Sequence, residues 1–242
     1  MLGKWTRVRE QEWKMSDKVR NYNRRYPSEY NFFRTLFYMS FVYLVVYPFM
    51  TIFYNYKITG RENLPKNTKD GKFIYTANHV SHFDPPMVSM ACNRPIAYMA
   101  KKELFQKGDK FEWFVKRLGA FAVDRTKPEI ATFKTVRDVL STKWSLGVFP
   151  QGGIRPYGTD ISGLKKGFIV IAKNAKADIV PVAIAGFDGY PKLKPFTRRN
   201  VHLHVGKPIS YKLSDDEIIK EWCRQITEYA DYTVSSEELV NI

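Results

Sequence analysis

The stretch FIYTANHVSHFDPP, residues 73–86, joins a β-prone run to a polar turn and then to the start of a helix. Residues 73–77 are mostly apolar and rich in β-formers, and the two prolines at the end of the stretch suit the first turn of a helix. The turn between them carries His79, His82 and Asp84. A strand that leads directly into a helix is typical of α/β folds, so these polar side chains are expected to project from a rigid strand end.

Strand and helix signals continue to alternate along the chain. We expect strands at residues 96–100, 121–123, 145–149, 179–185 and 201–205, and helices at 85–91, 110–118, 128–140, 165–175 and from 214 onward. This alternation predicts an α/β domain with helices on both faces of a sheet. The turn-forming segment GRENLP, residues 60–65, indicates a boundary, so we place a catalytic domain at residues 58–242 after an N-terminal segment at residues 1–57.

An apolar run precedes that boundary. Residues 36–53, LFYMSFVYLVVYPFMTIF, contain 18 residues without a charge, which reaches the lower length limit for a membrane span. Pro48 is expected to break or kink a helix here. Both flanks are basic, which favours a helix pair that enters and leaves the bilayer on its cytoplasmic face over a single span. We therefore expect a monotopic or shallowly inserted anchor, with a helix buried in the protein core as the alternative.

The composition limits the class of protein. The chain has 242 residues, 44% hydrophobic and 26% charged, so it can bury a core. Its 39 Lys and Arg residues exceed its 24 Asp and Glu residues, and the net charge of +15 suggests an anionic partner or simply solubility. Two well-separated cysteines exclude a disulfide scaffold and fit a cytoplasm-facing location. The sequence has no helix-turn-helix, RRM or zinc-finger signature, so we expect no nucleic-acid partner.

His79 and Asp84 are the candidates for acid–base chemistry. If His79 lies in the turn and Asp84 opens the helix, the carboxylate can orient the imidazole and stabilise its charged form, which makes a general base. Asp84 before proline also suits a simple helix N-cap, and a lone histidine at a strand end is often structural. A metal site is a further alternative, but the four histidines, His79, His82, His202 and His204, match no zinc spacing. Strand alternation places the last two on one sheet face without requiring a metal.

Two further clusters follow predicted strands. In GVFPQGGIRP, residues 147–156, a glycine pair lets backbone amides approach an anion, and Arg155 can bind a phosphate through two N–H groups. A tight turn with a solvated arginine is the simpler interpretation, and the segment lacks the Gly-Lys-Ser/Thr of a Walker loop. The other cluster is GAFAVDR, residues 119–125, which alone indicates no more than a surface ion pair.

Taken in order, these clusters resemble the four motif blocks of the glycerolipid acyltransferase family, typified by 1-acylglycerol-3-phosphate acyltransferase. His79 and Asp84 match the family's His-four residues-Asp block. Residues 119–125 match the second block, which ends in an arginine. Residues 149–155 match the Phe-Pro-Glu-Gly-Thr-Arg block, and residues 180–182 match a short Val-Pro block. The match runs in order across residues 60–182 and follows an apolar N-terminal segment.

One further match and two departures accompany these blocks. Lys101 stands where the family often has a lysine. In the third block, Gln151 replaces the family's glutamate and Gly153 replaces its threonine. The histidine–aspartate block is intact, so the resemblance still implies activity. The loss of charge at Gln151 bears on which acceptor is recognised.

The resemblance implies a mixed β-sheet flanked by helices, preceded by a membrane-associated helical motif. It implies an enzyme of phospholipid biosynthesis that moves a fatty acyl group from acyl-CoA or acyl carrier protein to the free hydroxyl of 1-acylglycerol-3-phosphate (lysophosphatidic acid), giving phosphatidic acid. His79 is then the general base, with Asp84 as its orienting carboxylate. No metal or other cofactor is implied. Substrate binding falls to Lys101, Arg125, Gln151, Gly152, Gly153 and Arg155.

Other functions stay open at this stage. The acceptor can instead be another lysolipid or glycerol-3-phosphate. The replacement of the family's glutamate by Gln151 also leaves open that the protein is a non-catalytic, membrane-bound relative that only binds lipid. A hydrolase that transfers the acyl group to water would need a nucleophile such as Ser81, but the chain lacks a Gly-x-Ser-x-Gly elbow.

Overall fold

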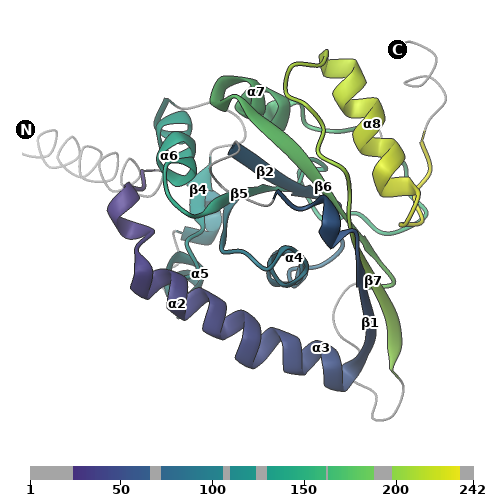
Figure 1. Ribbon diagram of the computed structural model, residues 1–242, viewed down its shortest axis with the longest axis horizontal. Helices are drawn as coiled ribbons and strands as arrows, with labels where there is room; N and C mark the ends of the chain where they lie inside the picture. Colours follow the sequence, from purple (N-terminus) through teal and green to yellow (C-terminus); the bar gives the residue numbers. More distant parts are fainter. Residues whose placement is uncertain are drawn as a thin grey trace, which may run out of the picture.

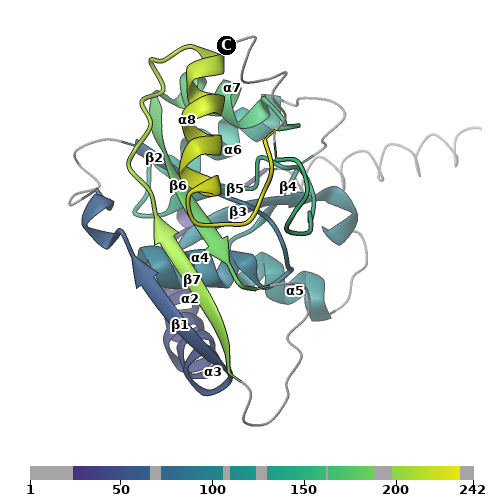
Figure 2. The same ribbon diagram turned by 90° about the vertical axis from the view of Figure 1, so that its right-hand side faces the viewer.

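The computed structural model describes residues 24–65, 72–105, 110–123, 130–161, 163–187 and 198–234. These residues form a seven-stranded sheet with helices on both sides (Figures 1 and 2). A long N-terminal helix and α4 (Asp84–Cys92) lie on one side of the sheet. The other side is covered by α6 (Ile130–Leu140), α7 (Gly167–Ala175) and α8 (Asp215–Thr227).

The sheet is mixed, as the resemblance implies. In spatial order its strands are β1 (Tyr54–Thr59), β7 (Arg199–Val205), β6 (Ala177–Ala185), β2 (Lys72–Ala77), β5 (Ser145–Val148), β3 (Ile96–Lys101) and β4 (Phe121–Val123). All neighbouring strands are parallel except β6 and β7, which are antiparallel. Every strand expected after residue 72 is present, and its ends lie within about two residues of the predicted ones.

The apolar run forms one helix that continues past Pro48, so the break expected there is wrong, and a kink at that position stays a prediction. The helix begins as α2 (Phe32–Phe41), passes through a π turn (Val42–Val46) and continues as α3 (Tyr47–Phe53). Proline has no N–H to donate, and the π turn just before it shifts the hydrogen-bond ladder, so the helix continues without that donor. A partner helix before residue 24 would lie outside the described residues.

One side of this helix packs on the domain and the other side is exposed. The buried side chains recur every four residues, at Tyr38, Val42, Val46 and Met50. On the outer side, Phe33 is 76% exposed and Leu44 is 75% exposed. The helix has the length and apolar composition to cross a membrane, but most of it is not enclosed by protein. The alternative of a helix buried in the core is therefore wrong.

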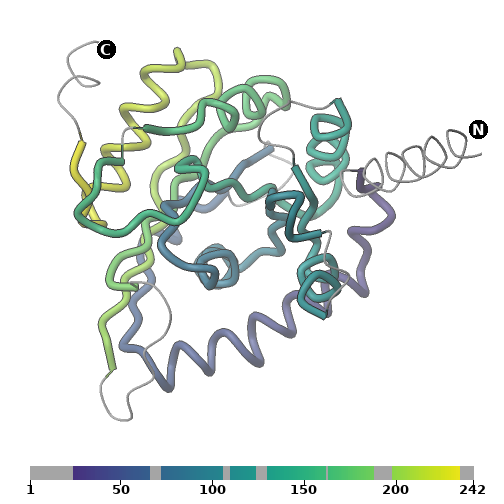
Figure 3. The backbone as a smooth tube through the Cα atoms, turned by 180° about the vertical axis from the view of Figure 1, so that it is seen from behind, coloured from purple at the N-terminus to yellow at the C-terminus, as the bar shows by residue number. Residues whose placement is uncertain are grey.

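The sequence analysis missed one strand, β1, which follows directly after the apolar helix. It pairs in parallel with β7 at the edge of the sheet, and the two strands run side by side in Figure 3. β1 spans the predicted boundary between residues 57 and 58, so strand pairing ties both sides of that boundary to one sheet. A division of the chain into two domains there stays a prediction.

Helix α8 holds β2 in place from the side of the sheet that faces away from the N-terminal helix and α4. It begins as predicted, with a capping box in which Ser214 and Glu217 bond each other's amides. Trp222 of α8 is fully buried, and its indole N–H donates to the Thr76 hydroxyl at 2.8 Å. Thr76 lies just before the polar turn of residues 78–84, so α8 helps to hold the strand from which that turn projects.

Candidate active site

The carboxyl ends of β2 and β5 bring two of the predicted clusters together. The register pairs Thr76 with Val148, so both strands end at the same edge of the sheet. Because the strands are parallel, the turn at residues 78–84 and the turn at residues 149–155 leave that edge as neighbours. The structure therefore joins the His79–Asp84 cluster to the glycine-rich cluster.

His79 and Asp84 are in direct contact. The Nδ1 atom of His79 lies 2.6 Å from Oδ2 of Asp84, and the same oxygen accepts the amide N–H groups of Val80 and Ser81 at 2.7 and 2.8 Å. An ionised carboxylate only accepts hydrogen bonds, so Nδ1 carries the proton of the neutral ring. Nε2 then keeps its lone pair for an incoming hydroxyl. This is the geometry of a general base with its orienting carboxylate.

Asp84 does not cap the helix, so the predicted N-cap at this position is wrong. Asp84 is the first residue of α4, and Phe83 is the N-cap. A capping side chain accepts the N–H of the second or third residue after it, but Pro86 has no N–H and the N–H of Met87 donates to the carbonyl of Phe83 at 3.3 Å. The Asp84 side chain instead turns back on the residues before it and meets His79.

The environment of Asp84 favours a charged partner. Burial raises the pKa of this carboxyl above its ordinary value, while the hydrogen bonds from His79 and the two amides act in the opposite direction. Its other oxygen, Oδ1, is buried and has no hydrogen-bond partner in the described part of the chain. When His79 takes up a proton, the imidazolium faces a carboxylate that water does not solvate, and this attraction stabilises the protonated base.

The glycine-rich turn holds the backbone and ring of His79. The His79 amide donates to Oε1 of Gln151 at 2.6 Å, and the His79 carbonyl accepts the amide of Arg155 at 2.7 Å. The imidazole stacks on Phe149, with ring centroids 4.2 Å apart. Gln151 is only 2% exposed, so it lies inside the protein behind His79, where its oxygen fixes the backbone of His79.

A second aromatic layer supports this arrangement. Tyr98 stacks on the far side of Phe149, with centroids 5.6 Å apart, and its hydroxyl donates to the carbonyl of Pro85 at 2.9 Å. Burial raises the pKa of Tyr98 well above its usual range, so it stays a donor. Gly147 makes room for this ring, because a Cβ there would lie 2.4 Å from it. The stack from Tyr98 through Phe149 thus sets the plane of His79.

The other predicted substrate-binding residues have different surroundings. Gly152 adopts a left-handed φ of 70°, which glycine allows without strain, whereas a Cβ at Gly153 would meet nothing within 4 Å. Arg155 is half-buried in the same turn, and Lys101 is exposed at the end of β3. Arg125 lies outside the described residues.

Lys165 is a cation near the site that the sequence analysis did not single out. Its amide donates to the carbonyl of Pro150 at 2.8 Å, and a Cβ on Gly152 would lie 2.9 Å from its Cγ. On the same pair of loops, a Cβ on Gly163 would lie 3.9 Å from Nη2 of Arg155. The segment around Lys165 therefore folds over the glycine-rich turn. The only sequence signal was a basic pair just before a helix, which is common.

The N-terminal helix reaches the turn of residues 78–84 through aromatic contacts. Phe49 of α3 packs against Phe83, with ring centroids 5.0 Å apart, and Phe83 directly precedes Asp84. Phe83 also stacks on Phe187, after β6. The apolar helix is thus in contact with the turn that carries the His79–Asp84 pair.

The remaining histidines form a separate cluster. The Thr59 hydroxyl bonds Nε2 of His202 at 2.7 Å and Nδ1 of His204 at 2.8 Å, which confirms that the two imidazoles share one sheet face. Burial lowers the pKa of both rings. His82 is exposed, and Ser81 is buried with its hydroxyl accepting the amide of Phe83. Within the described ranges, no three His, Cys, Asp or Glu side chains gather as a metal site would require.

The chain is similar to known acyltransferases. The family model described as Acyltransferase matches residues 55–185. The 1-acyl-sn-glycerol-3-phosphate acyltransferase of Bacillus subtilis (strain 168) is 33% identical over 157 residues, which cover 63% of this chain and 73% of that protein. The enzyme of the same name from Streptococcus pneumoniae (strain ATCC BAA-255 / R6) is 32% identical over 190 residues, covering 76% of this chain and 68% of that one.

A solved structure has the same fold. The crystal structure of the 1-acyl-sn-glycerophosphate (LPA) acyltransferase PlsC from Thermotoga maritima superposes with a TM-score of 0.61 at 27% sequence identity. The match covers 79% of this chain and 76% of that one. The family match spans the strands that carry the His79–Asp84 pair and the glycine-rich turn. The chain therefore belongs to the glycerolipid acyltransferase family.

Proposed function

We propose that this acyltransferase moves a fatty acyl group from a thioester donor to the free hydroxyl of 1-acylglycerol-3-phosphate and so makes phosphatidic acid for phospholipid synthesis. The observation that carries the proposal is the His79–Asp84 contact of 2.6 Å, held from behind by the glycine-rich turn. Two relatives that share about a third of their aligned residues with this chain are named for the same reaction. The thioester is acyl-CoA or acyl carrier protein.

The proposed chemistry follows from the free nitrogen of His79. Nε2 takes the proton of the acceptor hydroxyl as the hydroxyl oxygen attacks the thioester carbonyl carbon. The resulting imidazolium is stabilised by Asp84 through Nδ1. When the tetrahedral intermediate collapses, the C–S bond breaks and the proton passes from Nε2 to the leaving thiolate. The ring ends neutral, so one base serves both halves of the transfer.

We assign the acceptor phosphate to the predicted cations, of which Arg155 lies in the glycine-rich turn. Arg155 and Lys101 are the described members of the predicted set, and Arg125 completes it. The position of Lys165 across Gly152 adds a further cation on the same loops. Gly153 leaves the backbone accessible to an anion, because nothing lies within 4 Å of the place of a side chain there, and Gly152 makes room for Lys165 beside it.

Lys165→Ala is expected to raise the KM for lysophosphatidic acid about tenfold with kcat nearly unchanged, since it removes one charged contact to the phosphate. The matched control is Lys166→Ala. Lys166 is the next residue, but its ammonium lies 3.9 Å from Asp216 of α8 rather than over the turn. Steady-state kinetics with both variants measures the difference. Equal KM values for the two variants would remove Lys165 from the phosphate site.

We place the enzyme on the cytoplasmic face of the membrane, with the N-terminal helix lying in the bilayer interface. A helix that buries Tyr38, Val42 and Val46 on the domain cannot be surrounded by lipid, which argues against a simple span. Its outer side is apolar and exposed, which suits shallow insertion. The contact between Phe49 and Phe83 would bring a lipid acceptor close to the base.

A different acceptor is the second candidate. The family's threonine is replaced by Gly153, and a Cβ there would meet open space, so the turn has more room than the family pattern provides. Another lysolipid or glycerol-3-phosphate would use the same base and the same cations. The buried position of Gln151 argues that its replacement of glutamate acts on the His79 backbone rather than on the acceptor.

Acyl transfer by the purified full-length protein tests the proposal. Labelled lysophosphatidic acid is supplied with acyl-CoA or with acylated carrier protein, in parallel with glycerol-3-phosphate and lysophosphatidylcholine. We expect phosphatidic acid as the main product. If product forms only from another acceptor, that acceptor replaces lysophosphatidic acid in the proposal. If no combination of donor and acceptor gives product, the protein is better explained as a relative that binds lipid without turnover.

A further inference from the structure

Helix α5 (Lys110–Arg117) exposes two large aromatic side chains. Trp113 is 62% exposed and Phe111 is 53% exposed. Exposed tryptophan is uncommon on a water-facing helix, because a large ring side chain gains free energy when its apolar part leaves water. Nothing in the His79–Asp84 site or its aromatic support uses either ring. The exposure of these two rings therefore indicates a binding partner that is not among the described residues.

The charges on α5 identify the class of that partner. Lys110, Trp113 and Arg117 lie within an arc of about 60° at roughly 100° per residue, so one face presents an aromatic ring between two cations. The opposite side turns inward, where Glu112 is buried and pairs with Lys116. An aromatic ring flanked by cations suits the headgroup layer of an anionic bilayer, where the ring sits at the interface and the cations meet lipid phosphates.

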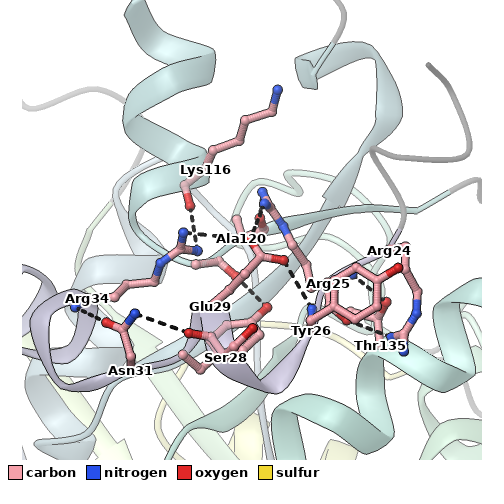
Figure 4. Close-up of polar contacts among 12 residues, drawn as sticks. Arg24, Arg25, Tyr26, Ser28, Glu29, Asn31, Arg34, Lys116, Ala120 and Thr135 are labelled. Carbon is pink, nitrogen blue, oxygen red and sulfur yellow. Dashed lines mark hydrogen bonds and ion pairs between the residues drawn. The ribbon is translucent and has the colours of Figure 1, made fainter.

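Contacts with α2 fix the orientation of α5. The ring of Phe114 packs against Phe41 with centroids 5.2 Å apart, and the guanidinium of Arg117 lies 5.6 Å from the ring centroid of Phe37. Arg34 donates to the carbonyl of Lys116 at 3.3 Å (Figure 4). The two helices therefore cannot move independently, and a surface that binds one of them positions the other.

Helix α5 packs beside the exposed apolar side of the N-terminal helix. Phe41 is one of the contacts between the two helices, and the turn after it exposes Leu44 and Val45. Phe111 lies about 160° around α5 from Trp113, so the two exposed rings do not meet one flat surface, and Trp113 is the ring that shares a face with Lys110 and Arg117. The apolar side chains exposed on this side of the long helix are Phe32, Phe33, Leu36, Tyr43, Leu44, Val45 and Ile52.

We propose that α5 is a second membrane-contact element, in which Trp113 inserts among the lipid headgroups and Lys110 and Arg117 bind anionic lipid phosphates. The proposal rests on the proposed membrane location of the enzyme and deepens it. Two contacts with the bilayer, α5 and the long helix, fix the tilt of the domain, whereas one helix alone leaves rotation about its own axis free. The tilt decides how far the turn that carries His79 stands from the lipid acceptor.

Partition of the full-length protein into vesicles tests the proposal. With vesicles of phosphatidylcholine and phosphatidylglycerol, Trp113→Ala and the pair Lys110→Ala/Arg117→Ala should each partition about tenfold more weakly than the wild type. The matched controls are Val170→Ala, an exposed apolar residue of α7, and Lys134→Ala/Arg137→Ala, an exposed basic pair of α6. These controls lie on the other side of the sheet and should partition like the wild type.

The charge pair also predicts a lipid dependence. On vesicles of phosphatidylcholine alone, Lys110→Ala/Arg117→Ala should partition like the wild type, because no anionic headgroup is present. If the α5 variants bind anionic vesicles as the wild type does while Leu44→Ser weakens binding, α5 makes no membrane contact and the long helix remains the anchor. If Leu44→Ser and the α5 variants all bind like the wild type, the proposed membrane location fails together with the proposed role of α5.

The depth of Trp113 gives a second measurement that does not depend on affinity. Brominated lipid quenches the fluorescence of tryptophans that enter the bilayer. Trp144 and Trp222 are buried in the protein, and subtraction of the Trp113→Phe signal from that of the wild type isolates Trp113. We expect strong quenching of the isolated signal. A difference signal that brominated vesicles leave unchanged would overturn the assignment of Trp113.

Discussion

Replacement of His79 by alanine is expected to lower kcat for acyl transfer about a thousandfold and to leave the fold intact. The loss has this size because general-base catalysis contributes on the order of 10²–10⁴ to a rate. The fold should survive, because the variant removes only a ring that stacks on Phe149. The hydrogen bond from the backbone N–H of His79 to Gln151 does not involve the side chain and is kept. Initial rates at saturating substrate, with circular dichroism of the same samples, measure both quantities.

His82→Ala is the matched control for this variant. It removes an imidazole from the same turn, but His82 is exposed and lies outside the His79–Asp84 contact. It should retain at least about half of the wild-type kcat. A His79→Ala enzyme within tenfold of the wild type would exclude His79 as the base, and equal losses in both variants would point to damage to the turn.

Replacement of Trp222 by alanine should lower the free energy of unfolding by about 3–5 kcal/mol, the usual cost of truncating a large buried aromatic side chain. Trp222 is fully buried between α8 and the sheet and packs near Phe168. Its loss also leaves the buried Thr76 hydroxyl without the indole N–H that it now accepts. Guanidinium unfolding followed by circular dichroism measures the change.

Trp222→Phe separates the two contributions. Phenylalanine fills much of the space but donates no hydrogen bond, so we expect a loss of about 1–3 kcal/mol from the unpaired hydroxyl and the residual cavity. Both variants should keep the wild-type kcat per folded molecule, because Trp222 does not touch His79. An alanine variant less than about 1 kcal/mol below the wild type would show that α8 contributes little to holding β2.

The sheet interior was predictable from sequence, and its first edge strand was not. Residues 73–77 and 179–185 are apolar runs that pack between two helical layers, and burial on both faces leaves a clear signal. β1 alternates polar and apolar residues directly after an apolar helix, and its partner is β7, far along the chain. Local pattern carries no information about such a distant partner, so the alternation in β1 does not by itself place this segment in the sheet.

For the candidate site too, one part could be predicted from the sequence and another part could not. The contact between His79 and Asp84 lies within six consecutive residues, in which a turn precedes two prolines. The roles of Gln151 and Lys165 depend on how two loops fold over each other. A buried glutamine that accepts the amide of His79 has the same sequence signature as one that binds a substrate.

The pairing of β1 with β7 has a consequence for synthesis on the ribosome. Asn55 and Asn200 bond across these strands and are 145 residues apart in the chain. The apolar helix before β1 therefore emerges long before the strand that will hold β1 in place exists. With the helix in the bilayer interface as proposed, its outer side can meet lipid from the start, whereas β1 gains its partner strand only when β7 is made, so delivery of the nascent chain to the membrane is expected to precede closure of the sheet.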